Sequence, residues 1–248
     1  MKFRADILLV NKGLVKSRTL AVIFIKNGSV FANGKVVAKA SEMIDELAEI
    51  KITETQPFVG RGGQKLKHAL DFWNVNVEGK ICLDIGSSTG GFTDCLLQAG
   101  AERVYAVDVG SEQLVPELLE NLKVISLEKT DIRKVESLTE VGKGAELAEA
   151  PSLVVIDVSF ISLTQILPHA IRLSSPNTEI IALIKPQFEL DSKSLNRNGI
   201  VTEESLRMKA LEKIKREAEK LGLKIAGETT SPITGGSGNI EFLIYLKK

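Results

Sequence analysis

The first fifty residues place apolar positions at the spacing of short helices followed by strands. In "RADILLVNKGL" and "SRTLAVIFIKNG" the apolar residues recur at helical spacing, and in the second stretch Ser17 can cap the helix start while Gly28 can end it. "SVFANGKVVA" then sets β-prone runs on either side of Asn33 and Gly34, the strongest short hairpin signal, and "AEIKIT" can add a strand. We predict a small α+β unit over residues 1–55.

The pattern changes after this unit to short apolar runs that alternate with helical stretches. "ETQPFVGRGGQ", rich in glycine, separates the two patterns, and we predict a linker over residues 56–63. Strands separated by crossover helices predict the α/β class, with a doubly wound, mainly parallel Rossmann-like sheet over residues 64–248. The predicted strands are "KICLDIG", "RVYAVDVG", "LKVISLEK", "SLVVIDVSF", "EIIALIKP", "LKIAGETT" and "NIEFLIYLK", and helices are predicted at 91–99, 162–173 and 202–221.

Composition and charge add a basic N-terminal segment to this picture. The 248 residues include 32 basic and 32 acidic side chains, so net charge alone indicates neither a nucleic-acid nor a membrane partner. Between Met1 and Ala40, however, eight residues are basic and Asp6 is the only acid. The predicted α+β unit therefore has a strongly basic start, although the chain as a whole is neutral.

Cysteine content and hydropathy exclude several classes of protein. Cys82 and Cys95 lie in apolar runs without the spacing of a disulfide framework or of a metal site, so we predict reduced core thiols and no metal. No apolar run approaches the ~20 residues of a membrane span, and "MKFRADILLVNKG" lacks the features of a signal peptide. We predict a cytoplasmic protein with no membrane partner and no stable protein partner.

The basic segment resembles a known RNA-binding module. "R-x-D-x-L-L-V-x-x-G-L-x-x-S-R", followed by "V-x-x-N-G-K-V-V", is similar to the αL module of small-subunit ribosomal protein four. Relatives commonly have Lys-Pro-Gly where this chain has "KAS", which affects a turn and not the basic face. The alternative is a solvated charged face. The resemblance implies RNA contacts, to which we add the arginine of "GRGG", and the predicted RNA-binding residues are Arg4, Lys12, Lys16, Arg18, Lys35 and Arg61.

"LDIGSSTGGFTDCLL" combines a strand, a glycine-rich turn and a helix. Small residues let backbone amides approach a ligand, and a helix start attracts negative charge. The stretch lacks the Gly-Lys-Ser/Thr of a P-loop and the G-x-G-x-x-G dinucleotide spacing. Asp108, twenty-two residues after Gly86 at the next strand end, is placed to accept hydrogen bonds from two ribose hydroxyls of a nucleotide without a 2′-phosphate. Asp131, after the third strand, can accept one from an adenine amine.

Together these features resemble the methyltransferase fold that binds S-adenosylmethionine. In that fold the glycine turn holds the methionine end of the cofactor, and the two acids hold its adenosine. The alternative is that Asp108 only caps a turn. By the resemblance, the cofactor-binding residues are Asp84, Gly86, Ser87, Ser88, Thr89, Gly90, Gly91, Phe92, Asp108 and Asp131.

Charged residues also mark the ends of other predicted strands. Because ligands of open α/β sheets bind beyond the carboxyl ends of the strands, Asp157 of "IDVSF" and Lys185 of "LIKPQFE" are predicted to face one crevice. Glu241 lies near the start of "NIEFLIYL", so it reaches the same edge if that strand is antiparallel. Lys65 of "RGGQKL" lies at the start of a helix. Two lysines and two carboxylates can therefore share a site.

Nearly the whole chain resembles the TlyA family, bacterial proteins often labelled haemolysins, through "RGGQKL", "DIGSSTGGFTDCLL", "YAVDVG", "DVSFISL" and "IKPQFE". That family is similar to FtsJ-type ribose 2′-O-methyltransferases. The resemblance implies S-adenosylmethionine as cofactor, ribosomal RNA or ribosomal subunits as partner, and a cytidine 2′-hydroxyl as acceptor. Relatives with an extra C-terminal helix are associated with both subunits, so this chain, which stops soon after its last strand, is predicted to favour the large one. The implied catalytic tetrad is Lys65, Asp157, Lys185 and Glu241.

Two roles for Lys185 follow from that resemblance. A 2′-hydroxyl is a weak nucleophile and needs a group that positions it and takes its proton. Asp157 and Glu241 are expected to hold Lys185 and to favour its ammonium form. Burial, Lys65 and the positive charge of the cofactor favour the neutral amine. Lys185 is therefore either the base or the group that orients the hydroxyl and stabilises developing charge. As alternatives, Lys185 can be a surface lysine paired with Asp157, and Lys65, like Lys67, can face RNA phosphate.

Two other classes of function stay open on the sequence. The chain can be an RNA-binding factor with an inactive methyltransferase domain, although the glycine turn, the ribose acid and the tetrad argue against it. It can also be a membrane-active haemolysin, which the missing signal peptide and apolar span disfavour.

Overall fold

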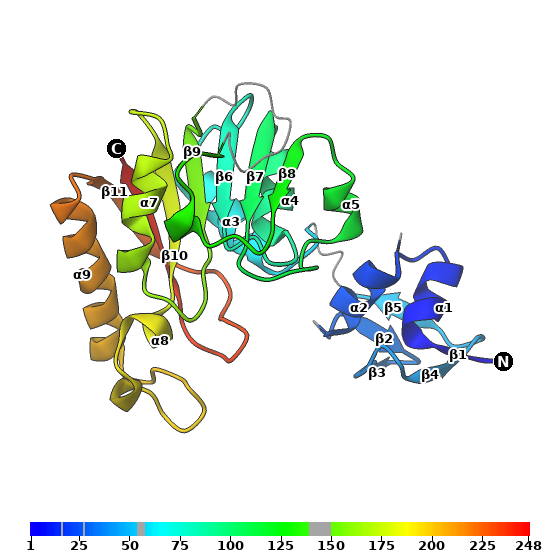
Figure 1. Cartoon of the computed structure of the whole chain (residues 1–248). Coiled ribbons are helices and arrows are strands. Elements are labelled where there is room, and N and C mark those ends of the chain that lie inside the picture. Colours follow the sequence, from blue (N-terminus) through cyan, green and yellow to red (C-terminus); the bar gives the residue numbers. More distant parts are fainter. Residues whose placement is uncertain (16, 27, 54–57, 139–149) are drawn as a thin grey trace. The chain divides into compact units, whose positions relative to one another are not determined.

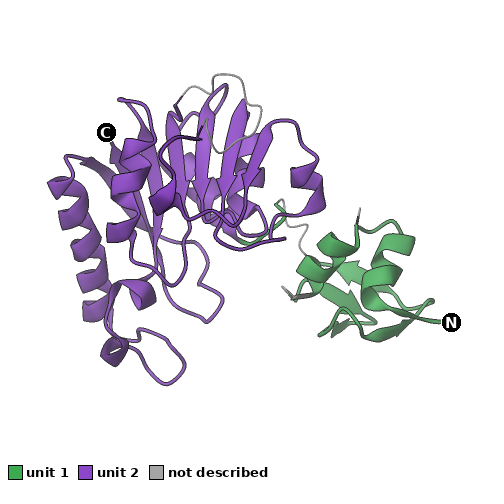
Figure 2. Cartoon of the chain, in the orientation of Figure 1, with its two compact units in different colours: residues 1–61 green, residues 62–248 purple. Residues whose placement is uncertain are grey.

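The protein folds into two compact units, residues 1–61 and residues 62–248 (Figure 2). The structure is a computed structural model and describes residues 1–15, 17–26, 28–53, 58–138 and 150–248. The basic segment belongs to the first unit, and the predicted cofactor and tetrad residues belong to the second.

The first unit combines a helix pair with short strands (Figure 1). Ser17 Oγ accepts a hydrogen bond from the Leu20 backbone N–H at 3.2 Å, so the predicted cap is confirmed. Asn33 and Gly34 have φ values of 48° and 76°, the left-handed conformations of a type I′ hairpin turn. The paired strands β1 and β4 are not among the predictions, because three-residue strands carry little periodicity. The elements are β1 (Lys2–Arg4), α1 (Ala5–Asn11), α2 (Arg18–Lys26), β2 (Val30–Ala32), β3 (Lys35–Val36), β4 (Met43–Asp45) and β5 (Ile50–Ile52).

The second unit is built on one seven-stranded sheet, in the order β11-β12-β10-β9-β6-β7-β8. Strands β6 to β10 run parallel, whereas β12 is antiparallel to β10 and to β11. This confirms the predicted doubly wound, mainly parallel fold and the antiparallel last strand. The strands are β6 (Ile81–Ile85), β7 (Arg103–Val107), β8 (Val124–Leu127), β9 (Leu153–Ile156), β10 (Glu179–Ile184), β11 (Lys224–Thr230) and β12 (Phe242–Lys247).

Helices cover both faces of this sheet (Figure 1). On one face Leu83 and Ile85 of β6 pack in a cluster with Leu167 and Ile214, which belong to α7 and α9. Asp84, between them in sequence, points to the other face and meets Thr93 of α4. A strand that is covered on both faces has apolar residues at successive positions, which explains "LVVI" in β9 and "IIALI" in β10. The helices are α3 (Gly62–Phe72), α4 (Gly91–Gln98), α5 (Pro116–Leu119), α7 (Leu167–Arg172), α8 (Pro186–Glu189) and α9 (Glu204–Lys220).

The helix predicted over 162–173 is interrupted. A 3₁₀ turn, η2 (Leu163–Gln165), comes first, and α7 begins only at Leu167. Ser162 Oγ accepts a hydrogen bond from the Thr164 backbone N–H and so starts the 3₁₀ turn. Pro168 lacks an N–H and occupies the first turn of α7, where that group is not needed. The predicted location of the helix was therefore right, but the prediction of one continuous helix was wrong.

Candidate active site

A cavity of about 540 Å³ opens beyond the carboxyl ends of the parallel strands. The chain runs from β6 outward through β7 and β8 and then returns to place β9 on the other side of β6. Reversal of strand order at such a point leaves a crevice, which is where open α/β sheets bind ligands. The lining residues come mainly from the segments after β6, β7, β8 and β9; among the predicted site residues they include Gly86, Ser88, Asp108, Asp131 and Asp157.

The glycine-rich turn after β6 brings two strand ends into close contact. Gly86 and Ser87 both donate backbone hydrogen bonds to the Val107 carbonyl oxygen, at 2.8 and 3.1 Å. Gly86 has a φ of 87°, and a Cβ built there would lie 2.6 Å from the Asp157 carbonyl oxygen. Only glycine fits this position, because both the conformation and the space exclude a side chain.

The two predicted adenosine acids have different surroundings. Asp108 accepts hydrogen bonds from the backbone N–H of Ser88 at 2.8 Å and of Gly110 at 2.7 Å, one on each oxygen, so it links the glycine turn to the loop after β7. Each oxygen keeps a lone pair for a further donor. Asp131 accepts hydrogen bonds from the Arg133 guanidinium and backbone, which lower the pKa of Asp131 to about 2. An adenine amine would therefore share Asp131 with Arg133, a partner that the sequence did not indicate.

Asp84 is fully buried beneath the glycine-rich turn and does not line the cavity. Burial raises the pKa of Asp84 to about 7, although the Thr93 hydroxyl donates a hydrogen bond to Oδ2 at 2.6 Å. Its Oδ1 has no hydrogen-bond partner among the described residues. Asp84 thus lies under the turn and away from the cavity surface, and its contact with the cofactor stays a prediction.

The raised pKa of Asp84 leads to a pH-dependence of stability. Because the folded state holds the proton more tightly than the unfolded state, this group lowers stability as pH rises from about 4 to about 7. We expect the wild type to lose stability relative to Asp84→Asn over this range, by on the order of a few kcal/mol. Denaturant unfolding of both proteins from pH 4.5 to 7.5 measures the difference. A pH-independent difference would contradict the assignment.

The four tetrad residues form two ion pairs. Lys185 Nζ lies 2.7 Å from Asp157 Oδ1 and donates a hydrogen bond to Ser159 Oγ at 2.9 Å. Lys65 Nζ donates a hydrogen bond to Glu241 Oε2 at 2.5 Å, and this pair is almost fully buried. Glu241 was expected to hold Lys185, but the described contacts give it Lys65 as partner. Two separate pairs therefore replace a single lysine held by two carboxylates.

Strand register explains how distant parts of the chain reach this edge. Asp157 and Lys185 directly follow the parallel strands β9 and β10. Ile184 pairs with Phe242 in the antiparallel ladder, so Lys185 and Glu241 each lie one residue beyond that pair. Helix α3 starts beside Asp157, because a Cβ at Gly62 would lie 3.5 Å from Asp157 Oδ2. Lys65 follows in the first turn of α3.

The predicted cofactor set is only partly exposed to the cavity. Ser87, Thr89, Gly90, Gly91 and Phe92 do not line the cavity, and Ser87 is buried within the turn. These residues form the turn and the start of α4, which shape the loop that presents Gly86 and Ser88. Of the predicted segment, side-chain and backbone direction therefore decide which members face the cavity, and the assignment of this set to the cofactor stays a prediction.

Several lining residues were missed by the sequence analysis. Ser159 and Phe160 follow Asp157, and Gly110 and Gln113 follow Asp108. Phe160 has a φ of 63° and is 91% exposed, an unusual state for an aromatic side chain. The sequence could have indicated these residues, because each lies within a few residues of a predicted strand end, where ligands of such sheets bind.

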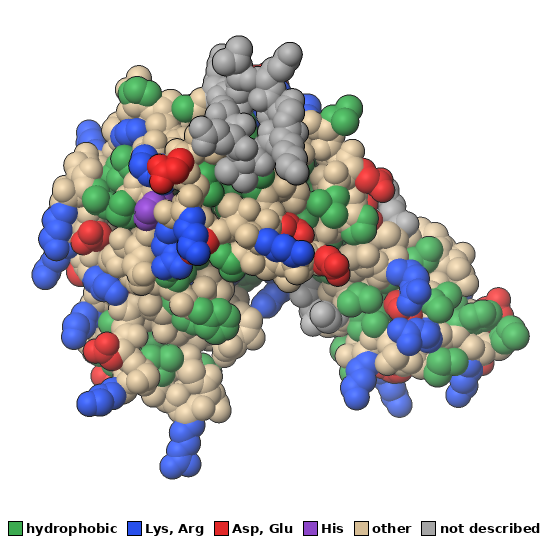
Figure 3. Space-filling view, viewed as in Figure 1, with side chains coloured by type: hydrophobic (Ala, Val, Ile, Leu, Met, Phe, Trp, Pro, Cys, Tyr) green, Lys and Arg blue, Asp and Glu red, His purple; other side chains and the backbone are tan. Residues whose placement is uncertain are grey.

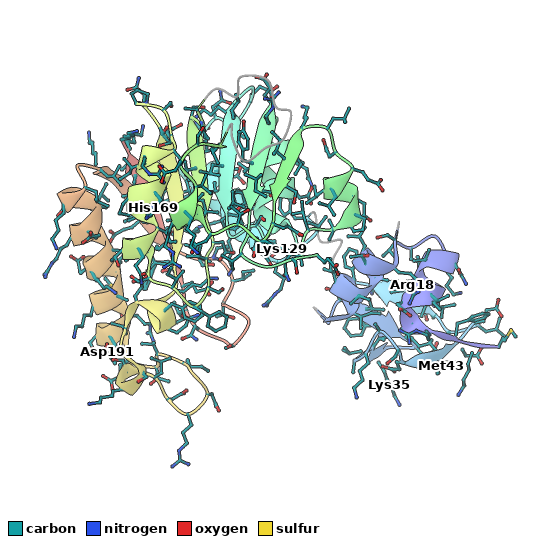
Figure 4. All side chains as sticks on the ribbon, in the orientation of Figure 1. Arg18, Lys35, Met43, Lys129, His169 and Asp191 are labelled. Atoms are coloured by element: carbon teal, nitrogen blue, oxygen red, sulfur yellow. The ribbon has the colours of Figure 1, made fainter. Side chains whose placement is uncertain are left out.

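Basic residues of the first unit were predicted to bind RNA. Arg4 and Arg18 both donate hydrogen bonds to buried Asp6, and those from Arg4 hold the pKa of Asp6 well below its usual range. Figure 3 shows Lys and Arg side chains on the visible face of this unit, and Figure 4 labels Arg18 and Lys35. Lys12, Lys35 and Arg61 are exposed, and Lys16 lies outside the described residues.

The cavity fits S-adenosylmethionine in size and chemistry. Its volume of about 540 Å³ lies within the roughly 300–1,000 Å³ of small-molecule sites. Ile85, Val107, Ile132 and Ile166 supply an apolar wall for an adenine ring, and Asp108 supplies free lone pairs for ribose hydroxyls. Across the described residues, no group of three or more His, Cys, Asp or Glu is arranged to hold a metal ion.

Comparison with known families divides the chain in two. The model described as FtsJ-like methyltransferase matches residues 58–248, and the S4 domain model matches residues 3–50. None of the helices that the structure describes combines the length and apolarity needed to cross a bilayer.

Individual relatives carry two kinds of name. Hemolysin A of Brachyspira hyodysenteriae is 39% identical, with 98% of each chain covered. The 16S/23S rRNA (cytidine-2′-O)-methyltransferase TlyA of Mycobacterium tuberculosis is 38% identical over 98% of this chain and 89% of its own. The 23S rRNA (cytidine-2′-O)-methyltransferase TlyA of Campylobacter jejuni is 34% identical over 96% of this chain and 97% of its own. A solved hemolysin-labelled protein of Streptococcus thermophilus is 43% identical, with a TM-score of 0.77 over 100% of this chain and 88% of its own.

Proposed function

The chain belongs to the FtsJ-like methyltransferase family and carries an S4 domain, and on that premise we propose that it methylates a cytidine ribose 2′-hydroxyl of ribosomal RNA. The observation that carries the proposal is the ion pair of Lys185 with Asp157, whose carboxylate also lines the cofactor cavity. This pair places a proton-handling group beside the cavity. The relatives named as rRNA (cytidine-2′-O)-methyltransferases support the same acceptor.

Binding of the cofactor is assigned to the residues around the cavity. When bound, S-adenosylmethionine supplies a methyl group on a positively charged sulfur. Asp108 would accept hydrogen bonds from the ribose of the bound cofactor, and Gly86 and Ser88 would form the adjacent wall. Asp131 would accept a hydrogen bond from the adenine amine beside Arg133. Asp157, which lines the cavity, would offer a carboxylate to the positively charged sulfur of a bound cofactor.

Lys185 is the residue proposed to contact the 2′-hydroxyl. An ammonium has three N–H donors; Lys185 donates one to Ser159 Oγ and forms an ion pair with Asp157. A further N–H can donate to the 2′-oxygen, orient it and stabilise developing negative charge. In its neutral form Lys185 would instead accept the proton of the hydroxyl. Because Lys185 forms an ion pair with Asp157, orientation of the hydroxyl is the preferred role.

The pair of Lys65 and Glu241 is proposed to support the acceptor side of the site. Leaving either buried charge without its partner would cost several kcal/mol of desolvation free energy. The ion pair therefore fixes the start of α3 relative to the start of β12. Gly235 packs directly against Glu241, since a Cβ there would lie 2.4 Å from Oε1. Lys65 and Glu241 thereby hold the loop before β12 at the edge of the site.

The S4 domain is proposed to bring the methyltransferase unit to its RNA. Arg4 and Arg18, ordered on Asp6, together with Lys12 and Lys35, are the proposed phosphate contacts. Lys16 and Arg61 complete the set predicted from the sequence. Large-subunit RNA is the proposed substrate, because 23S rRNA is named for both TlyA relatives whereas 16S rRNA is named for one. The same proposal places the protein in the cytoplasm, where ribosomes are assembled.

Mapping of 2′-O-methyl groups tests this function. Ribosomal subunits from a strain without such an enzyme are incubated with purified protein and S-adenosylmethionine, and both rRNAs are mapped. We expect one new 2′-O-methylcytidine in 23S rRNA, absent when the cofactor is omitted. Methylation of 16S rRNA alone would overturn the subunit assignment, and no new methyl group in subunits or in free rRNA would overturn the proposed function.

A further inference from the structure

We propose that Glu189 is a positioning residue that holds together the two loops carrying the catalytic pair. These are the β9 loop, residues 157–162, which begins with Asp157, and the β10 loop, residues 185–190, which begins with Lys185. The inference rests on the proposed function, because it concerns how the same site is assembled. Helix α9 takes part as well, and it lies beside α8 (Figure 1).

Glu189 is an acidic side chain buried between three segments. It ends α8 and is 6% exposed. Its Oε2 accepts a hydrogen bond from Ser162 Oγ at 2.5 Å and one from Lys213 Nζ at 3.1 Å, and Oε1 accepts one from the Leu163 backbone N–H at 2.8 Å. Lys213 Nζ also donates to the Glu189 carbonyl oxygen at 2.7 Å. One carboxylate therefore joins the end of the β9 loop, the end of the β10 loop and α9.

Other contacts between the loops involve Lys185 and a pair of aromatic rings. Lys185 touches Asp157 and Ser159, and the rings of Phe160 and Phe188 are 5.0 Å apart. An acceptor hydroxyl that binds Lys185 lies beside these contacts, so they can rearrange when substrate binds. The Glu189 carboxylate itself is buried, so a substrate in the cavity does not compete for its contacts. They hold the loops in register when the outer contacts open.

The β9 loop also forms part of the cofactor cavity. Ser159, Phe160 and Ile161 line it together with Asp157. The position of the Lys185 amine relative to the cavity wall is therefore governed by the same buried carboxylate. A displacement of about 1 Å between reacting groups can cost on the order of 100-fold in rate. Loss of the Glu189 contacts should accordingly reduce turnover more than it reduces binding.

Glu189→Gln tests this role with little change of size. The amide oxygen can still accept from Leu163 N–H, but the NH₂ group cannot accept from Ser162 or Lys213. With full-length protein, S-adenosylmethionine and large ribosomal subunits, we expect kcat to fall about 10- to 100-fold. The KM values for cofactor and for subunits should stay within about threefold. Ser162→Ala, which removes one partner only, should lower kcat less and serves as the second variant if Glu189→Gln does not fold.

Glu179→Gln is the matched control. Glu179 starts β10, at the opposite end of the strand from Lys185, and binds Lys80 and Tyr245. Burial opposes its ionisation, but the hydrogen bonds from Lys80 and Tyr245 lower the pKa of Glu179, so this substitution also removes a stabilising carboxylate. We expect a lowered melting temperature with kcat unchanged. Equal losses of kcat in both variants would mean general destabilisation and would overturn the inference, as would an unchanged kcat in Glu189→Gln.

Hydrogen exchange separates this inference from the proposed function. We expect Glu189→Gln to speed amide exchange in both loops at least about tenfold, while Glu179→Gln leaves them unchanged. If the wild type transfers no methyl group to rRNA, the proposed function fails, and the exchange data still decide whether Glu189 holds the loops. Unchanged exchange in Glu189→Gln would overturn the positioning role whatever the activity.

Discussion

Lys185→Ala is expected to lower methyl transfer by about 10²- to 10⁴-fold while the affinity for S-adenosylmethionine stays within about threefold. The amine is the group that reaches the 2′-hydroxyl, and alanine removes it together with its contacts to Asp157 and Ser159. Lys185 itself does not line the cofactor cavity, so binding of the cofactor is preserved. Single-turnover transfer to large ribosomal subunits and calorimetric titration of the cofactor measure the two effects.

Two further variants sharpen that experiment. Lys224→Ala removes an exposed lysine from β11. Lys224 pairs with Lys247, so it lies at the end of the sheet opposite to Lys185, and the substitution should leave methyl transfer unchanged. Lys185→Arg keeps the positive charge but cannot release a proton near neutral pH. Partial activity in the arginine variant favours orientation by a cation, and complete loss favours proton transfer. Wild-type activity in Lys185→Ala would refute its catalytic assignment.

Gly86→Ala is expected to destabilise the protein by about 2–5 kcal/mol and to weaken cofactor binding at least about tenfold. The new Cβ meets the Asp157 carbonyl oxygen at 2.6 Å, and the backbone conformation at a φ of 87° disfavours any L side chain. Relief of that clash must move either the glycine-rich turn or the start of the β9 loop. Both border the cavity, so stability and cofactor affinity fall together. Denaturant unfolding and cofactor titration measure the changes.

Gly222→Ala separates the cost of conformation from the cost of crowding. Gly222 has a φ of 78°, but nothing lies within 4 Å of a Cβ at that position. This control should lose only about 1–2 kcal/mol, the cost of a left-handed alanine, and should bind the cofactor normally. If both alanine variants lose the same stability and keep the same cofactor affinity, close packing of Gly86 against Asp157 has no functional role.

The fold was predictable where its signals are local. The predicted hairpin at Asn33 and Gly34, the cap at Ser17 and the alternation of strands and helices depend on neighbouring residues, and the structure confirms them. The interruption near Pro168 was missed because apolar spacing continues across it. The β1–β4 pair was missed because each strand is too short to show a period and is stabilised by its distant partner.

The candidate site was predictable as a set of positions and not as a set of contacts. Strand ends in the sequence identified Asp157 and Lys185 as neighbours, since parallel strands end at one edge. The sequence did not indicate that Glu241 would form an ion pair with Lys65, or that Arg133 would donate hydrogen bonds to Asp131. It also did not indicate that Glu189 would join two loops. Each of these contacts joins side chains whose directions depend on packing.

The sequence by itself therefore determined the family, the alternation of strands and helices in the second unit, and the residue types available for methyl transfer. Apolar periodicity and turn residues act over short distances, so one sequence suffices to recognise them. Only the tertiary structure decided which carboxylate partners which lysine and which residues of the glycine-rich turn face the cavity. Those choices follow from the register of β10 with β12 and from burial, because a buried charge must find its partner among the groups that the fold brings within reach.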